Sequence, residues 1–322
     1  MVDIDMKYIA LTIVAIIFPY FALAQAVQFG DQGLAIDLEP AFPQPGQAFT
    51  ATANDYSLPI QGTTIRWSIN GELRNEYLNE RVIPGTAPLL GKEMTIKLEV
   101  SLPTGGSVSI ERTIAPVNLD IILEPQTRTP AFFKGRGLPS IGSKINATAI
   151  VNGNKVLPSS LIYTWRLNST VLESGSIQGR NNISFSMPQG RRATLVLDVR
   201  ELNGEPLAQR IIDVPSVTPS ISFYEISTLY GFKQKAVGTA VPLLGDSITL
   251  RAEPYNLDLA TYNEPDHLEW KIAGVRTQSS AGNPYEITLA ATGGSGRVPV
   301  SFHVRNTVQL LQGSQGSFDI TY

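Results

Sequence analysis

Cysteine is absent from this 322-residue chain, and histidine occurs only twice. Without a thiol the protein forms no disulfides, thiolate nucleophiles, zinc–cysteine sites or iron–sulfur clusters. Charged residues are scarce at 16%, and a net charge of −3 offers no basic surface for nucleic acid and no polybasic patch for a membrane. We therefore expect no nucleic-acid partner and no cofactor.

Residues typical of strands and turns are abundant. The chain is 43% hydrophobic and contains 27 glycines and 22 prolines. This composition favours an all-β protein of many short strands, and its apolar content is sufficient for hydrophobic cores. The length suits two or three domains.

The first 24 residues have the three parts of a secretory signal peptide. Lys7 precedes an apolar run over 8–21, and Ala22-Leu23-Ala24 follows as an A-x-A cleavage site. A bilayer-spanning helix needs about 20 apolar residues, more than this run provides. The sequence thus predicts cleavage after Ala24 and an extracytoplasmic location (periplasmic, cell-surface or secreted), without a membrane span in the mature chain. A retained N-terminal anchor is the alternative.

Three tryptophans mark a repeat in the rest of the chain. Trp67, Trp165 and Trp270 are 98 and 105 positions apart, and a regular period near 100 residues indicates tandem domains. Each lies in a segment that alternates apolar and polar residues, which places the apolar set on one face of a strand. Residues suited to hairpin turns follow each segment: Asn70-Gly71, Asn168-Ser169 and Ala273-Gly274.

The same order of strands recurs around each tryptophan. Two strands precede it, an alternating strand ends 33 or 34 residues after it, and a closing strand follows. The expected strands are 35–38, 49–53, 94–100 and 108–114 in the first copy, 119–123, 145–150, 193–199 and 209–214 in the second, and 221–224, 248–252, 298–304 and 317–322 in the third. Such short strands with Gly, Pro and Asn between them are typical of a two-sheet sandwich.

This arrangement resembles the immunoglobulin-like superfold and its PKD-like relatives. Tyr163-x-Trp165 is its most PKD-like element, although the glycine-aspartate turn of PKD domains does not follow it. We therefore predict an all-β protein with three tandem immunoglobulin-like β-sandwich domains, over 25–116, 117–216 and 217–322. Short proline-rich joints, over 114–118 and 214–219, predict a stiff rod.

The tryptophans are the predicted structural core of the three domains. Antibody-type domains have a cysteine pair and a tyrosine corner, and both are missing here. Burial of one tryptophan contributes about 4–6 kcal/mol, compared with about 2–4 kcal/mol for a disulfide. Each domain is thus expected to fold without a bridge and to unfold independently.

At the level of the whole mature chain, the sequence resembles a set of exported multi-domain proteins of ultra-small candidate-phylum bacteria. The matching segments are Ile162-Tyr163-Thr164-Trp165, Phe132-Phe133-Lys134-Gly135, Phe223-Tyr224-Glu225 and Leu250-Arg251-Ala252-Glu253-Pro254-Tyr255. The resemblance implies a bacterial origin, export and tandem domains. It supplies no activity.

No pattern of catalytic residues emerges, and we predict that the protein is not an enzyme. There is no G-x-S-x-G motif, and the glycine-rich segment 293–296 lacks the lysine of a phosphate loop. His303 is expected on the outward, solvated face of its strand, and His267 in an acidic loop. The carboxylates near that loop would offer oxygen ligands to calcium, but their spacing matches no calcium motif, so no metal site is predicted. They are Glu253, Asp258, Glu264, Asp266 and Glu269.

Two segments interrupt the repeat and mix aromatic with basic residues. They span 129–139 in the second domain and 229–235 in the third, within connections between the first two expected strands that are longer than the matching connection of the first domain. Because aromatic residues and arginine are enriched at protein interfaces, we predict a partner-binding edge here. The predicted contact residues are Phe132, Phe133, Lys134, Arg136, Tyr230, Phe232, Lys233 and Lys235. The alternative is that the rings cap a sandwich or pack on the neighbouring domain.

The sequence as a whole predicts a non-catalytic, extracytoplasmic structural or adhesive rod that presents loops to a protein partner. A surface assembly such as a pilus or secretion apparatus would be its setting. A carbohydrate-binding accessory protein is the alternative, and would display coplanar aromatic side chains on a sheet face. An enzyme comes third and would need a deep cleft with two converging carboxylates. The oligomeric state stays open.

Overall fold

The computed structural model describes residues 33–55, 63–103, 105–153, 157–173, 175–227, 229–280, 282–291, 293–309 and 311–322. The predicted signal peptide, residues 1–24, lies outside them. The described residues are almost entirely strands and turns, with a single short α-helix among them, α1 (Leu259–Asn263). None of the helices in this part of the chain has the length and apolar character needed to span a membrane.

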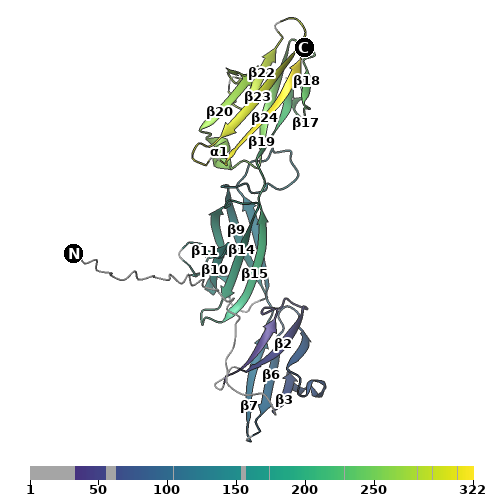
Figure 1. Cartoon of the computed structure of the whole chain (residues 1–322), viewed down its shortest axis with the longest axis vertical. Coiled ribbons are helices and arrows are strands. Elements are labelled where there is room, and N and C mark those ends of the chain that lie inside the picture. The colour runs from purple at the N-terminus through teal and green to yellow at the C-terminus, as the bar shows by residue number, and fades with distance from the viewer. Residues whose placement is uncertain are drawn as a thin grey trace, which may run out of the picture. The chain divides into compact units, whose positions relative to one another are not determined.

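The chain divides into two compact units. The first comprises residues 1–41, 49–85 and 95–113, and the second comprises 42–48, 86–94 and 114–322. The second unit contains both the second and the third β-sandwich, drawn from teal to yellow in Figure 1. The predicted domain boundaries fall in the connections β7–β8 and β15–β16.

The first sandwich has a three-stranded and a four-stranded sheet. The three-stranded sheet has the order β1 (Leu34–Glu39), β2 (Ala48–Asp55), β5 (Val82–Thr86). The four-stranded sheet has the order β4 (Glu72–Leu73), β3 (Thr64–Ile69), β6 (Met94–Ser101), β7 (Ser107–Ile114), and a short 3-10 helix, η1 (Asn75–Tyr77), follows β4. Alternate residues of β3 and β6 are buried, among them Ile65, Trp67, Ile96 and Leu98.

The second sandwich repeats this plan and belongs to the second unit. One sheet has the order β13 (Asn182–Ser186), β9 (Lys144–Asn152), β8 (Asn118–Pro125). The other has the order β11 (Thr170–Val171), β10 (Ile162–Leu167), β14 (Arg192–Arg200), β15 (Pro206–Pro215), with β12 (Ile177–Gln178) also paired to β10. The 3-10 helix η2 (Pro158–Ser160) precedes β10. A single apolar cluster around Trp165 fills the space between the sheets.

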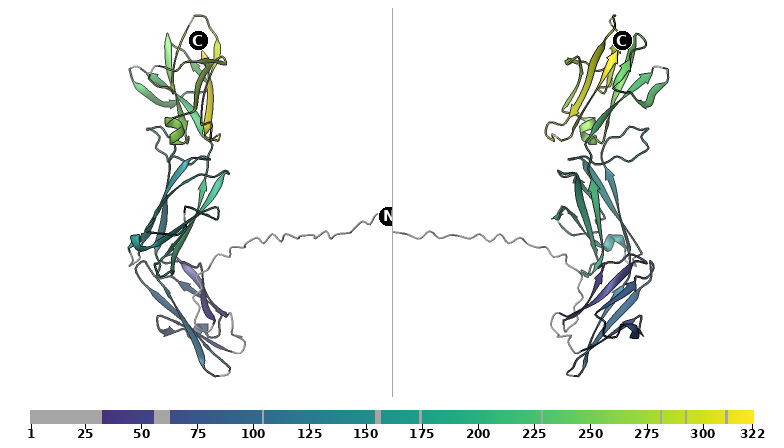
Figure 2. Two further views of the ribbon diagram at one scale, coloured as in Figure 1. Left: turned by 90° about the vertical axis from the view of Figure 1, so that its left-hand side faces the viewer. Right: turned by 45° about the vertical axis from the view of Figure 1, so that its right-hand side comes forward.

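The third sandwich has larger sheets, whose two layers are visible in Figure 2. One has the order β17 (Gly231–Ala236), β16 (Ser220–Ser227), β19 (Ser247–Tyr255), β22 (Glu286–Ala290). The other has the order β18 (Ala240–Pro242), β24 (Gly313–Thr321), β23 (Arg297–Arg305), β20 (His267–Ile272), β21 (Val275–Thr277), with β18 parallel to β24. Its core is built around Trp270.

The prediction of three immunoglobulin-like sandwiches is confirmed, and so is the pairing around each tryptophan. Every expected strand is present, and the three tryptophans lie directly opposite Leu98, Leu197 and Phe302 of the predicted later strand. The predicted hairpin turns are also confirmed. Both turn residues have a positive φ in each case, as for Asn70 at 52° and Gly71 at 82°, which is the geometry of a two-residue hairpin turn.

Several short strands were not predicted, and one of them recurs in each sandwich: β5, β13 and β22. Each has five residues and few buried apolar side chains, so its alternating pattern is short. The segment 231–236 was expected among presented loops and is strand β17 instead. The missed strands complete the sheets opposite the tryptophans.

Each buried tryptophan also joins the two sheets of its sandwich by one hydrogen bond. The indole Nε1–H donates to a backbone carbonyl two residues before the strand β5, β13 or β22 of the opposite sheet. The three bonds are Trp67 to Glu80 at 2.9 Å, Trp165 to Arg180 at 3.2 Å and Trp270 to Pro284 at 3.1 Å. The same connection therefore recurs in all three domains, none of which contains a cysteine.

Trp165→Phe and Trp165→Ala separate the contribution of the indole hydrogen bond to stability from that of apolar burial. Phe retains most of the apolar volume but leaves the carbonyl of Arg180 without its donor, so we expect a loss of about 1–3 kcal/mol. Ala also leaves a cavity, and we expect a loss of about 3–5 kcal/mol. Urea unfolding monitored by circular dichroism measures the free energy of unfolding of both variants. Equal stability of Trp165→Phe and the wild type would show that the hydrogen bond contributes nothing.

Candidate functional site

The second and third sandwiches are joined by backbone hydrogen bonds in addition to the covalent connection. The segment after β8 pairs with the segment before α1, where Thr127 and Asp258 form a β-bridge. Arg128 N–H donates to the Leu257 carbonyl at 2.6 Å, and Asn256 N–H donates to the Arg128 carbonyl at 2.8 Å. This pairing fixes the end of one sandwich against the start of α1 in the next.

Two buried polar side chains extend this junction. Asp258 caps α1 by accepting from the Ala260 N–H at 3.0 Å, and its other oxygen accepts from the Lys144 N–H of the second sandwich at 3.1 Å. Gln312 donates to Ser140 Oγ at 2.9 Å and accepts from the Asp258 N–H at 3.0 Å. Because these groups are buried, each needs its partner across the junction to avoid a desolvation penalty.

A buried carboxylate pairs with arginines from both sandwiches. Glu253 is 2% exposed, its Oε2 lies 3.0 Å from Nη2 of Arg128, and its Oε1 lies 2.7 Å from Nε of Arg251. The guanidinium of Arg128 also stacks over the ring of Tyr262, 4.5 Å from its centroid. Glu253 was considered as a calcium ligand, but here it forms ion pairs with two guanidinium groups.

The two aromatic segments meet on the outer face of the β16–β19 sheet. The Phe132 ring lies 5.2 Å from Tyr224 and 5.1 Å from Phe232. The neighbouring Phe133 packs edge-on against Tyr255 at 5.5 Å. Burial and a hydrogen bond with Tyr224 raise the pKa of the Tyr255 phenol. The segment from the second sandwich thus covers part of the third, which explains why Tyr224 is buried although it lies on an outward face.

The eight predicted contact residues divide into a packed group and an exposed group. Phe132 and Phe232 are half-buried and pack against each other where the two sandwiches meet. Phe133 is 42% exposed and Tyr230 84% exposed. The exposed members form what we call the junction surface: Phe133, Lys134, Arg136, Tyr230, Lys233 and Lys235. Lys233 forms an ion pair with Glu225 at 2.7 Å.

The carboxylates considered for calcium are largely occupied by protein donors. Asp258 and Glu253 hold the junction, and Asp266 accepts from the Thr307 N–H at 2.7 Å and from its hydroxyl at 3.0 Å. These hydrogen bonds lower the pKa of Asp266. Glu264 ends α1, where its N–H donates to the Ala260 carbonyl.

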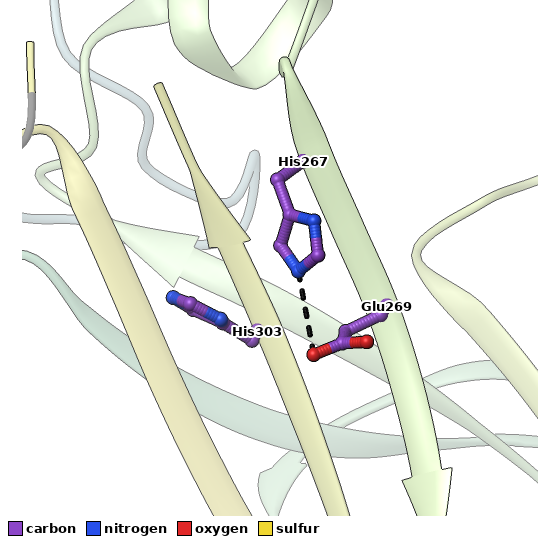
Figure 3. A group of neighbouring side chains, drawn as sticks. All are labelled: His267, Glu269 and His303. Atoms are coloured by element: carbon purple, nitrogen blue, oxygen red, sulfur yellow. Dashed lines mark ion pairs between the residues drawn. The ribbon is translucent and has the colours of Figure 1, made fainter. Parts of the chain in front are cut away.

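A different group brings metal-binding side chains together within the described residues: His267, Glu269 and His303 (Figure 3). His267 was expected in a loop, which is wrong, because it is the first residue of β20. His303 lies on the outward face of its strand as expected, but is half-buried instead of fully solvated. Burial, followed by the neighbouring charges of His267 and Arg305, lowers the pKa of His303. The pKa of Glu269 is lowered, chiefly by a hydrogen bond from Lys271.

No family model and no curated protein matches this chain. Among solved structures, it is similar to the central fibronectin-III array of RIM-binding protein, at 10% identity over 92% of this chain and 99% of that one, with a TM-score of 0.28. It is also similar to three N-terminal domains of the bacteriophage RB49 highly immunogenic outer capsid protein, at 11% identity over 89% and 97% of the two chains, with a TM-score of 0.25. A third is the Bacteroides ovatus mixed-linkage glucan utilization locus SGBP-B, bound to a mixed-linkage heptasaccharide. That match has 14% identity over 86% and 63% of the chains and a TM-score of 0.22.

Identities and TM-scores this low carry no argument about function. The assignment of the fold rests on the strand order and the tryptophan-centred cores of the three sandwiches.

Glu253→Ala tests the junction. It leaves Arg128 without its carboxylate and leaves Arg251 only its longer pair with Glu286, at 3.6 Å, so we expect a loss of about 3–5 kcal/mol in urea unfolding, as for a broken buried ion pair. In calorimetry, we expect the second and third sandwiches to unfold together in the wild type and in separate transitions in Glu253→Ala. Asp213→Ala is the matched control, because its pair with Arg192 is exposed and is worth at most about 1 kcal/mol. A Glu253→Ala loss no larger than that of the control would contradict a stabilising junction.

Proposed function

We propose that this chain is a non-catalytic, extracytoplasmic structural or adhesive protein that binds a protein partner through the junction surface. The observation that carries the proposal is the exposure of Phe133 and Tyr230 beside basic side chains, on segments whose neighbouring rings are packed. Aromatic anchors on a preorganised platform lose little conformational entropy on binding.

The charges of the junction surface favour an acidic partner. Four of its six members are Lys134, Arg136, Lys233 and Lys235, whereas the whole chain has a net charge of −3. A local basic patch on an acidic protein guides a complementary acidic surface and determines its orientation more than its affinity. The partner we propose is thus a protein with acidic side chains around an aromatic or aliphatic pocket.

The distribution of aromatic residues supports a protein partner over a carbohydrate. A glycan-binding platform needs exposed rings on a sheet face. Among the described residues, the exposed aromatic side chains are Phe133, Tyr230 and Tyr322, which lie in a loop, in a turn and at the C-terminus. The three tryptophans are buried.

The proposed setting is a bacterial surface assembly such as a pilus or secretion apparatus. Export rests on the predicted signal peptide, and the bacterial setting on the resemblance of the sequence. Stiff tandem sandwiches suit the role of a spacer, because they hold a binding surface away from its attachment point.

Crosslinking in intact cells, followed by mass spectrometry of the captured protein, tests the proposal. We expect one partner to be captured by the wild type, and Tyr230→Ala to weaken its binding at least about fivefold, or about 1 kcal/mol. Lys134→Glu combined with Arg136→Glu would slow association and reduce its dependence on salt.

Leu244→Ala is the control for this experiment, because Leu244 is 92% exposed and lies outside the junction surface. Equal capture by Tyr230→Ala, the charge variant and this control would contradict the proposed surface. Capture of a glycan in place of a protein would favour the carbohydrate-binding alternative.

A further inference from the structure

Two neighbouring strands of the third sandwich place three metal-binding side chains on one outward face. His267 and Glu269 are two residues apart on β20, so both point to the same side of the sheet. Glu269 pairs directly with His303 of β23. The adjacent residues Trp270 and Phe302 are buried in the core and hold both strands in place.

The distances within this group are close to those of a coordination sphere. The three ligand atoms lie within 4.8 Å of one another, and His267 Nε2 is 3.3 Å from Glu269 Oε1. Two ligands of a tetrahedral zinc ion, at about 2.0–2.2 Å from the metal, are about 3.3 Å apart. One edge of the tetrahedron therefore already has the required length, and the His303 ring lies beside this pair of side chains (Figure 3).

The composition of the chain makes this group conspicuous. The chain has only two histidines and no cysteine, and both histidines lie in this group, with ring centroids 5.3 Å apart. The side chains are also partly withdrawn from water, with exposures of 29% for His267 and 13% for Glu269. Partial burial limits their motion and reduces the entropy that a bound ion would cost.

One neighbouring cation competes for the same position. Lys271 Nζ lies 2.7 Å from Glu269 Oε1, the oxygen that also faces His267. Its side chain is 41% exposed on a flexible stem, so it can move into solvent when another cation binds. The group thus already attracts one positive charge. A divalent ion would carry twice the charge and would also be bound by two imidazoles, so we expect it to bind there more strongly than an ammonium.

We propose that His267, Glu269 and His303 bind one Zn²⁺ ion on the outer face of the third sandwich, with water in the fourth position. Two imidazoles and one carboxylate are a ligand set of zinc, whereas calcium needs six to eight oxygen ligands. The site is independent of the junction surface, because it lies on the opposite sheet of the sandwich. It departs from the sequence-based expectation that the chain holds no metal.

Equilibrium dialysis of the untagged mature chain against Zn²⁺, with metal analysis, tests the proposal. We expect one Zn²⁺ per chain, and a thermal unfolding midpoint that rises with Zn²⁺ and returns to its starting value with EDTA. His267→Gln, His303→Gln and Glu269→Gln should each weaken binding at least about tenfold. Cu²⁺ and Ni²⁺ should compete for the site, since imidazole ligands suit them as well, and Ca²⁺ should not.

Lys271→Gln provides a test that does not depend on removing a ligand. It deletes the competing ammonium, so the proposed site should bind Zn²⁺ more tightly in this variant than in the wild type. Glu225→Gln, on the other sheet, is the control and should leave the affinity unchanged. Circular dichroism verifies that each variant is folded.

The proposal is overturned if the wild-type chain takes up less than one equivalent of Zn²⁺. It is also overturned if His303→Gln leaves the affinity for Zn²⁺ unchanged. It is equally overturned if Lys271→Gln does not raise the affinity. Visible absorption of the Co²⁺-substituted protein adds a readout of the coordination geometry: tetrahedral bands support the site, and an octahedral spectrum contradicts it.

Discussion

The hydrogen bond from each buried indole to the opposite sheet is the interaction on which the three sandwiches depend. A two-sheet sandwich without cysteine needs something besides shape to fix one sheet against the other. The indole occupies the centre of the core, and its N–H is satisfied by a carbonyl two residues before β5, β13 or β22. A shift of either sheet would leave that buried donor without a partner, at a cost of about 1–3 kcal/mol. One side chain therefore provides both the apolar burial and the alignment of the sheets.

The strands around the tryptophans were predictable because a half-buried strand must alternate its side chains. The alternation of Ile65, Trp67 and Ile69 is visible in the sequence, and Ile65 and Trp67 are buried in β3 on either side of an exposed residue. The acceptors of the indole bonds were not predictable, since every residue has a carbonyl and Glu80, Arg180 and Pro284 share no side-chain property. The short strands that follow them carry too few apolar residues for a clear pattern.

The candidate site was predictable in composition but not in arrangement. Phe132 and Phe232 were identified by their residue types, yet their contact joins positions 100 residues apart. The role of Glu253 was hidden for the same reason, because its partner Arg128 comes from the preceding domain. Likewise, His267 and His303 meet only through the register of β20 and β23. Sequence patterns report which face a residue occupies, whereas these contacts depend on which strands are neighbours.

The two outer faces of the third sandwich differ in their surroundings, and the core separates them. On the β16–β19 sheet, the segment from the second sandwich covers Tyr224, and the buried Glu253 is committed to two arginines. On the β20–β23 sheet, the outward side chains keep their access to solvent and to cations. Because the layer of Trp270, Phe302 and Phe223 separates the faces, a substitution on one face leaves the geometry of the other intact. The proposed binding of a partner at the junction surface, which also includes residues of the second sandwich, and the proposed binding of an ion at the histidines are therefore separable.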